Sequence, residues 1–299
     1  MMQKKSILIG SNGYLGRHLA YHLENAGFDN MNCDLTETPP EEFRNYRRID
    51  ITRASDLEKL DFDVDYVFVF AGLTGTANGF EKYRDFINVN ETGLLNVLTR
   101  LRDTGSKARV VFPSTRLVYR GRKNHMLRED DPKETKTIYA ANKLNAENLL
   151  WMYRNAFGIN YTVFRICVPY GNLFGGEFSY GTIGFFMSRA RQGEDITMFG
   201  DGTIRRTFSH VSDISEVILK AIQMPETENE IYNIGGENLS LLDAARMVAD
   251  KYGVKVIFRD WPEMALKLES DDTVFDDTKL QALLKSGYRH SLNEWLRKG

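Results

Sequence analysis

The sequence predicts an α/β fold built on a doubly wound parallel sheet, with a second, smaller and discontinuous lobe toward the C-terminus. Short apolar runs alternate with amphipathic segments over the first two thirds of the chain, and the first run leads directly into a glycine-rich turn. The run at 67–71, Val-Phe-Val-Phe-Ala, is continuously apolar, as in a strand covered by helices on both faces.

The same pattern gives the elements in order. Strands are predicted at 6–10, 30–33, 64–71, 109–113 and 161–167, and helices at 15–25, 80–101, 139–157 and 212–224. The helix at 139–157 is predicted to end at Gly158, a residue type that commonly caps helix C-termini. Beyond Pro169 the alternation weakens, and residues 170–207 are rich in glycine and aromatic side chains. This change of pattern predicts a second lobe made of separate pieces.

The composition describes a soluble protein whose partner is a small molecule. Lysine and arginine (39) nearly balance aspartate and glutamate (41) among 299 residues, so we expect no nucleic-acid or membrane partner. No apolar run approaches a membrane span, and the two cysteines, Cys33 and Cys167, do not imply a disulfide framework, so a cytoplasmic location is expected. No metal site is predicted. His18 and His22 share a helix face and are expected on its surface.

The glycine-rich turn predicts a dinucleotide site. Gly10, Gly13 and Gly16 follow a strand and open a helix, so backbone amides and the helix N-terminus can approach a pyrophosphate. Asp34 ends the second strand, where a carboxylate can accept hydrogen bonds from the adenosine ribose and repel a ribose phosphate. These residues predict NAD, rather than NADP, as the cofactor. The alternative is a tight turn beside a surface aspartate.

Tyr139 and Lys143 predict a proton carrier for this redox chemistry. They are four residues apart on a predicted helix and therefore share a face. We expect the Lys143 ammonium, together with a bound cationic nicotinamide, to favour the ionised phenol, and lowering a tyrosine pKa from about 10 to about 7 requires roughly 4 kcal/mol. A purely structural tyrosine is the alternative for Tyr139 by itself.

Together these motifs resemble the extended short-chain dehydrogenase/reductase family, in particular its NAD-dependent nucleotide-sugar epimerase/dehydratase group. The resemblance rests on Gly10-x-x-Gly13-x-x-Gly16, Ala71-Gly72, Asn90, Ser114-Thr115, Tyr139-x-x-x-Lys143, Tyr170-Gly171, Gly200-Asp201-Gly202 with Arg206, and the 275–280 segment. It implies a Rossmann-type NAD-binding domain made of residues 1–168 and of 207–230, where the chain returns to it. The remaining segments, 169–206 and 231–299, form a substrate-binding lobe. It also implies that the cofactor is contacted by Gly10, Asn12, Gly13, Tyr14, Leu15, Gly16, Asp34, Asp50, Ile51, Ala71, Gly72, Asn90, Tyr139 and Lys143.

The resemblance further implies a catalytic group of Thr115, Tyr139 and Lys143. It also implies that Thr115, Arg116 and Arg206 bind the substrate. The dehydratases of the family have an Asp-Glu pair after the Thr115 position, and the decarboxylases have a glutamate. This chain has Arg116-Leu117, which favours a reaction like that of UDP-galactose 4-epimerase: transient oxidation of a nucleotide sugar at C4. A 4-keto-sugar reductase uses the same three residues and is the close alternative, and a non-catalytic NAD-binding scaffold is a third possibility.

Two departures from the family concern the substrate. Val168 stands where the family commonly has asparagine, and Glu269-Ser270-Asp271-Asp272 stands where a second phosphate-binding arginine is expected, with Arg259 as a substitute. The nucleotide and the sugar are therefore left open. The resemblance also implies a homodimer that pairs the helices near 83–101 and 139–157 as a four-helix bundle.

Overall fold

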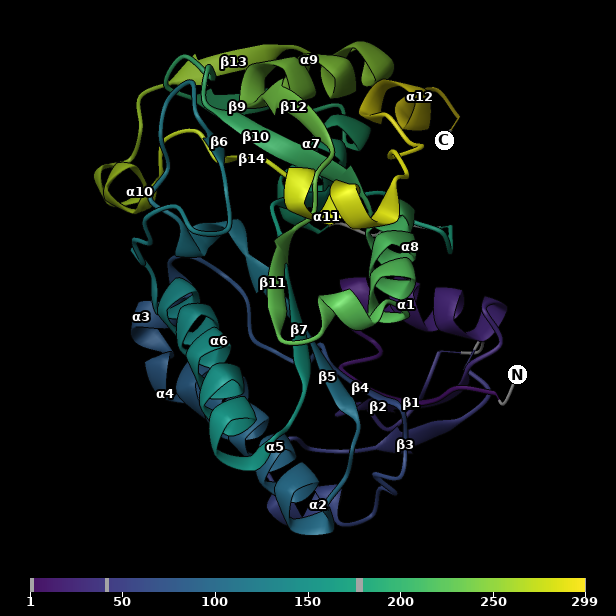
Figure 1. Ribbon diagram of the computed structural model, residues 1–299. Coiled ribbons are helices and arrows are strands. Elements are labelled where there is room, and N and C mark those ends of the chain that lie inside the picture. Colours follow the sequence, from purple (N-terminus) through teal and green to yellow (C-terminus); the bar gives the residue numbers. More distant parts are fainter. Residues whose placement is uncertain (1–2, 41–42, 176–179, 299) are drawn as a thin grey trace.

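The computed structural model describes residues 3–40, 43–175 and 180–298, and its centre is a seven-stranded parallel sheet (Figure 1). Its strand order is β11-β7-β5-β4-β1-β2-β3. The strands are β1 (Lys5–Ile9), β2 (Asp29–Asp34), β3 (Tyr46–Arg48), β4 (Tyr66–Val69), β5 (Arg109–Thr115), β7 (Tyr161–Ile166) and β11 (Glu230–Asn233). The chain moves outward from β1 on one side and from β4 on the other, which opens a crevice at the carboxyl ends of these two strands. The predicted fold class is confirmed.

Helices cover both faces of this sheet. One face packs against α2 (Ala54–Leu57), α5 (Gly93–Thr104) and α6 (Ile138–Phe157), and the other against α1 (Tyr14–Asn25), α8 (Val211–Ile222) and α11 (Thr278–Leu284) (Figure 1). Successive strand residues point to opposite faces, so Ile7 lies in one hydrophobic core and Leu8 in the other. This explains why the strands are apolar throughout rather than alternating.

The second lobe has its own core, above the carboxyl ends of the strands in Figure 1. A three-stranded sheet joins β8 (Val168–Tyr170), β10 (Arg205–His210) and β12 (Glu237–Ser240), while β9 (Ile196–Phe199) pairs with β13 (Val256–Arg259) and β6 (Met126–Leu127) with β14 (Val274–Phe275). The helices of this lobe are α7 (Gly181–Arg191), α9 (Leu241–Tyr252), α10 (Glu263–Leu268) and α12 (Leu292–Lys298).

The two units interleave more than the predicted domain bounds imply. Strand β11 pairs with β7 in the main sheet, so the predicted boundary between 230 and 231 falls inside a strand of that sheet. Leu280 of α11 is fully buried in the core beneath α1 and α8. In the other direction, Phe208 of β10 pairs with Val168 in the small sheet. The chain therefore crosses between the two units several times.

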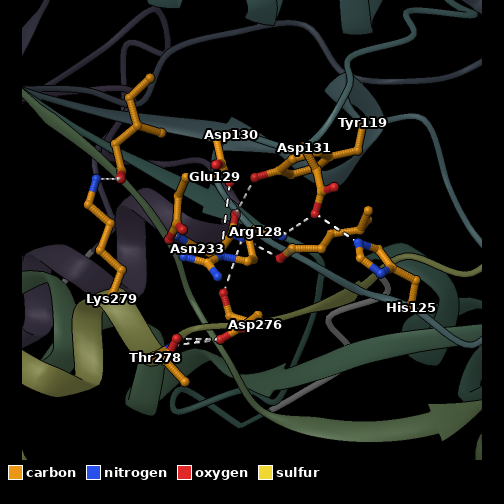
Figure 2. Close-up of polar contacts among 12 residues, drawn as sticks. Tyr119, His125, Arg128, Glu129, Asp130, Asp131, Asn233, Asp276, Thr278 and Lys279 are labelled. Carbon is orange, nitrogen blue, oxygen red and sulfur yellow. Dashed lines mark hydrogen bonds and ion pairs between the residues drawn. The ribbon is translucent and has the colours of Figure 1, made fainter.

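A polar cluster ties the C-terminal tail to the main sheet. Figure 2 shows Asn233, at the end of β11, among side chains from three segments. The hydroxyl of Tyr119 donates to Asn233 Oδ1 over 2.7 Å, and the Asn233 backbone N–H donates to Glu129 Oε1 over 2.8 Å. The Asn233 side-chain amide donates to the carbonyls of Leu127 and Asp276. One asparagine thus joins the strand, the segment between β5 and α6, and the tail.

The helix predicted at 80–101 is interrupted. The segment forms α3 (Asn78–Glu81), α4 (Tyr83–Ile87), a π-helical turn (Asn88–Thr92) and then α5. The π turn carries the buried Asn90, whose side-chain amide bonds the backbone of Leu73. Such turns are frequent at functional sites. This one lets the Asn90 side chain point inward to the Leu73 backbone.

The expected surface position of His18 is wrong. The side chain is fully buried on α1, with Nδ1 2.7 Å from the Tyr14 carbonyl, and Nε2 accepts the Leu173 N–H over 3.1 Å. The loop after β8 packs across α1 and covers this position, a contact between segments that are more than 150 residues apart. In the described residues no helix is both long and apolar enough to cross a membrane.

Candidate functional site

The glycine-rich turn leaves no room for side chains. Gly10 has φ +96°, and a Cβ atom there would lie 2.2 Å from the Ala71 nitrogen. A Cβ atom at Gly16 would lie 2.0 Å from the Gly10 carbonyl oxygen. Helix α1 begins at Tyr14, its N-cap Gly13 has no side chain, and its first turn contains no acidic residue. The positive end of the helix dipole therefore has no competing carboxylate of its own, which fits the pyrophosphate of a dinucleotide.

Asp34 lies beside this turn at the end of β2. Its Oδ2 accepts the Asn12 backbone N–H over 2.9 Å, and its Oδ1 accepts the Leu35 N–H over 2.7 Å. Each carboxylate oxygen has a further lone pair, so the half-buried group can still accept from ribose hydroxyls. The structure thus brings Asn12 and Asp34 to the same edge of the turn.

The remaining predicted cofactor residues surround the crevice in different ways. Asp50 accepts both the backbone N–H and the hydroxyl of Thr52, and Ile51 is buried beneath the main sheet. The Asn90 side-chain amide forms two hydrogen bonds with the backbone of Leu73. It therefore positions the segment that follows β4, where Ala71 and Gly72 lie. Leu15 lines the central cavity, whereas the Tyr14 hydroxyl donates to the Gly171 carbonyl over 2.7 Å.

Thr115 and Tyr139 come together at the carboxyl end of β5. Thr115 is buried and caps the short 3₁₀ turn Arg116–Val118 by accepting the Leu117 N–H. Tyr139 lies in the first turn of α6, which starts where Thr137 caps the Ala140 N–H over 3.1 Å. Thr115 and Tyr139 line one cavity. They form a pair of hydroxyls that can act on a single substrate oxygen.

Lys143 lies one turn further along α6, and its ammonium bonds the backbone of β5. Its Nζ donates to the Pro113 carbonyl over 2.7 Å and lies 4.2 Å from the centre of the Phe112 ring. The distance from Nζ to the centre of the Tyr139 ring is 6.0 Å. Lys143 therefore holds the end of β5 and, through it, the backbone beside Thr115.

Burial governs the protonation of both groups. It raises the pKa of the Tyr139 phenol far above its ordinary value, reinforced by Tyr180 and opposed by the Thr115 hydroxyl. Burial also lowers the pKa of the Lys143 ammonium to about 7, opposed by the Glu147 carboxylate. Desolvation of the phenolate therefore dominates over Lys143, whose ammonium bonds a backbone carbonyl, and the lowering of the phenol pKa beside a cationic nicotinamide stays a prediction.

The cavity above this pair has a volume of about 660 Å³ and extends into the second lobe. Arg206, a predicted substrate residue, reaches it from β10 with a side chain that is 1% exposed. Its Nη2 donates to Glu269 Oε1 over 2.5 Å, and its Nη1 donates to the Asp271 carbonyl over 2.8 Å. Burial lowers the pKa of Arg206 to about 10, aided by repulsion from Arg116 and opposed by Glu269. A phosphate at this guanidinium would have to compete with Glu269.

Several cavity residues have no clear signal in the sequence. Phe199 and Trp261 face each other with ring centres 5.5 Å apart, and both line the lobe end of the cavity with Glu269. Phe199 directly precedes the Gly200-Asp201-Gly202 turn, which could have marked it, but nothing in the pattern indicates Trp261 or Glu269. Arg259 is exposed on β13 and is not among the cavity-lining residues.

The Cys167 thiol and the metal-ligating residue types of the chain are two further possible sources of reactivity. Cys167 lines the cavity, but its thiol donates to the Thr273 carbonyl over 3.2 Å and burial raises its pKa, which keeps it protonated. Over the described ranges, no group of three or more histidine, cysteine, aspartate or glutamate side chains is arranged to hold a metal ion.

Comparison with known proteins identifies the same architecture and motifs. A model described as the NAD dependent epimerase/dehydratase family matches residues 6–235. A UDP-N-acetyl-alpha-D-glucosaminuronate decarboxylase from Bacillus cytotoxicus is 30% identical over 255 residues, which cover 79% of this chain and 76% of the relative. A dTDP-4-dehydro-6-deoxy-D-allose reductase from a Streptomyces species is 27% identical over 260 residues, covering 81% of this chain and 79% of the relative.

Among solved structures, the UDP-glucose 4-epimerase of Thermus thermophilus in complex with NAD aligns with a TM-score of 0.84 at 22% identity and covers 98% of both chains. The family match confirms the predicted resemblance and confirms NAD as the cofactor. The relatives catalyse different reactions, so the choice among them depends on this chain's own cavity.

Proposed function

Because the chain belongs to the NAD dependent epimerase/dehydratase family, we propose that it is a nucleotide-sugar epimerase that oxidises its substrate transiently at the sugar C4. The observation that carries the proposal is that Thr115 and Tyr139 line one wall of the cavity, with Arg116 and Leu117 as the next residues along the chain after Thr115. Among the described residues, this end of the cavity has groups for moving one proton, and the two residues after Thr115 are not the acid/base pair needed for water elimination.

The chemistry follows from these two hydroxyls. When bound, NAD supplies the hydride acceptor and donor and a positively charged ring that favours the phenolate. Tyr139 takes the proton of the sugar 4-hydroxyl as C4 becomes a ketone, and Thr115 holds the same oxygen through its hydroxyl. After the keto sugar turns over, Tyr139 returns the proton as hydride reaches the opposite face. Lys143 keeps the end of β5 in place through the Pro113 carbonyl.

The cavity supports this reaction over two others of the family. Dehydration and decarboxylation need an acid or base beside Thr115, and Arg116 and Leu117 provide neither. Glu269 lines the cavity but is held in an ion pair by Arg206. The second candidate, a 4-keto-sugar reductase, is supported by the 27% identity to a reductase. Asp34 beside the glycine turn favours the epimerase, because its charge opposes the ribose phosphate of NADP.

The substrate is proposed to lie across the cavity, with its sugar at Thr115 and its nucleotide in the second lobe. Arg206 would bind the diphosphate after exchanging Glu269 for phosphate oxygens, since a guanidinium can bind either group with two parallel hydrogen bonds. Phe199 and Trp261 offer aromatic faces for the base. On this reading the main sheet is the NAD-binding domain and the second lobe is the substrate-binding domain.

A homodimer is also proposed, through α4 and α6. These helices carry exposed large apolar side chains, with Tyr83 44%, Ile87 42%, Trp151 59% and Met152 45% exposed. Exposed apolar side chains gathered on neighbouring helices are typical of subunit interfaces. Sedimentation at micromolar concentration should give twice the mass of the chain, and a charged residue in place of Trp151 should give the monomer.

The test of the reaction uses nucleotide sugars labelled with deuterium at C4, presented as UDP, dTDP, GDP and CDP derivatives. An epimerase should convert one of them to its C4 epimer over many turnovers per NAD, with the deuterium retained in the product. A requirement for one equivalent of reduced cofactor per product would instead establish the reductase.

A further inference from the structure

Arg116 is a half-buried cation at the catalytic end of the cavity. It follows Thr115 directly and is one of the residues that line the cavity. Its Nη1 donates to Ser270 Oγ over 3.2 Å and lies 3.5 Å from Thr273 Oγ1. Among residues 3–40, 43–175 and 180–298, no aspartate or glutamate forms an ion pair with it, so only neutral hydroxyls contact this charge.

The other arginine of the cavity is different. Arg206 has Glu269 as a partner at 2.5 Å, and Arg116 is close enough to repel it. The same short segment serves both guanidinium groups, because Glu269 faces Arg206 while Ser270 and Thr273 face Arg116. Among the described residues that line the cavity, the charged ones are therefore two arginines and one glutamate. An arginine in a concave, partly apolar site is stabilised strongly by a bound anion, because opposite charges attract each other more strongly away from bulk water.

The position of Arg116 relative to the reacting carbon indicates where that anion would be. The Thr115 and Tyr139 hydroxyls mark the position of the sugar 4-oxygen, so the substituents on the carbons next to C4 are those closest to the residue that follows Thr115. The diphosphate, attached at C1 across the ring, is directed to Arg206. A carboxylate matches the planar, two-pronged donor geometry of a guanidinium.

We propose that Arg116 binds a carboxylate carried by the sugar beside C4, so that this protein prefers nucleotide-activated uronic acids to neutral hexoses. The placement of the sugar rests on the proposed function. The preference itself is a property of binding, and it can be measured without turnover.

The experiment measures dissociation constants by calorimetry in the presence of NAD, in a Tyr139→Phe background that prevents conversion during the titration. The ligands are UDP-glucuronic acid, UDP-glucose and UDP. We expect UDP-glucuronic acid to bind at least tenfold more tightly than UDP-glucose. Arg116→Met should remove that difference, weakening UDP-glucuronic acid by tenfold or more while changing UDP-glucose and UDP by less than threefold.

Two variants control for folding and for general charge. Arg116→Lys keeps the charge and should retain part of the preference, and Arg120→Met removes an exposed arginine of the same segment and should leave all three affinities unchanged. Equal affinities of the parent protein for the two sugars would overturn the assignment. So would an Arg116→Met variant that weakens UDP as strongly as UDP-glucuronic acid, since Arg116 would then bind the diphosphate. Failure of all three ligands to bind would instead count against the proposed function.

Discussion

The two ends of the cavity are built in different ways. At the catalytic end, Thr115 ends a strand of the main sheet and Tyr139 starts the helix that packs on that sheet, so both are placed by regular elements. At the lobe end, Arg206 is held by Glu269 and Asp271, more than 60 residues further along the chain. The first end is therefore fixed by elements of the main sheet, whereas the second depends on contacts between segments far apart in the sequence.

The largest expected effect is at the catalytic end. Tyr139→Phe removes only the oxygen that carries the proton, so turnover should fall by about 10³-fold while NAD still binds. Steady-state kinetics together with NAD calorimetry measure both quantities. Tyr21→Phe, at an exposed tyrosine of α1, is the matched control. Turnover within a factor of ten of the parent protein would exclude Tyr139 as the proton carrier.

The next effect is on stability at the lobe end. Glu269→Ala leaves the guanidinium of Arg206 buried without a carboxylate, which should cost about 3 kcal/mol of unfolding free energy. UDP should then raise the melting temperature of the variant more than that of the parent, because the diphosphate can take the place of the missing carboxylate. The control is Glu263→Ala at an exposed position of α10. An equal response to UDP in variant and parent would show that the diphosphate does not reach Arg206.

The pH dependence of stability tests the burial of Lys143. Its folded-state pKa of about 7 lies below the ordinary value of 10.5, so between these values the unfolded chain binds the extra proton and the folded protein loses stability as the pH falls. Relative to Lys143→Met, the parent should therefore lose about 2 kcal/mol between pH 9 and pH 7.5. Denaturant titrations at both pH values measure this.

Lys107→Met, at an exposed lysine, should show no such change. A parallel response of parent and Lys143→Met would mean that Lys143 stays charged in the folded protein.

The smallest expected effect concerns the choice of cofactor. Asp34→Ser removes the charge that opposes a ribose phosphate and should reduce the preference for NAD over NADP by about tenfold, or about 1.4 kcal/mol. Calorimetry with each cofactor measures the ratio. The control is Asp29→Ser, at the start of the same strand. An unchanged ratio would assign the preference to a different residue.

The sequence alone determined the features that depend on neighbours a few residues away. Apolar runs gave the parallel strands, glycine spacing gave the turn into α1, and the four-residue spacing of Tyr139 and Lys143 gave a shared helix face. These features follow from strand and helix periodicity, which is local. They were sufficient to predict the fold class and the cofactor.

The tertiary structure decided what those local features contact. It placed β11 in the main sheet, buried His18 under the loop after β8, and turned Lys143 toward the Pro113 carbonyl. It also paired Arg206 with Glu269 and placed the hydroxyls of Ser270 and Thr273 beside Arg116. None of these follows from periodicity, because each depends on which distant segment packs against a residue, and that packing sets both its partners and the desolvation that shifts its pKa.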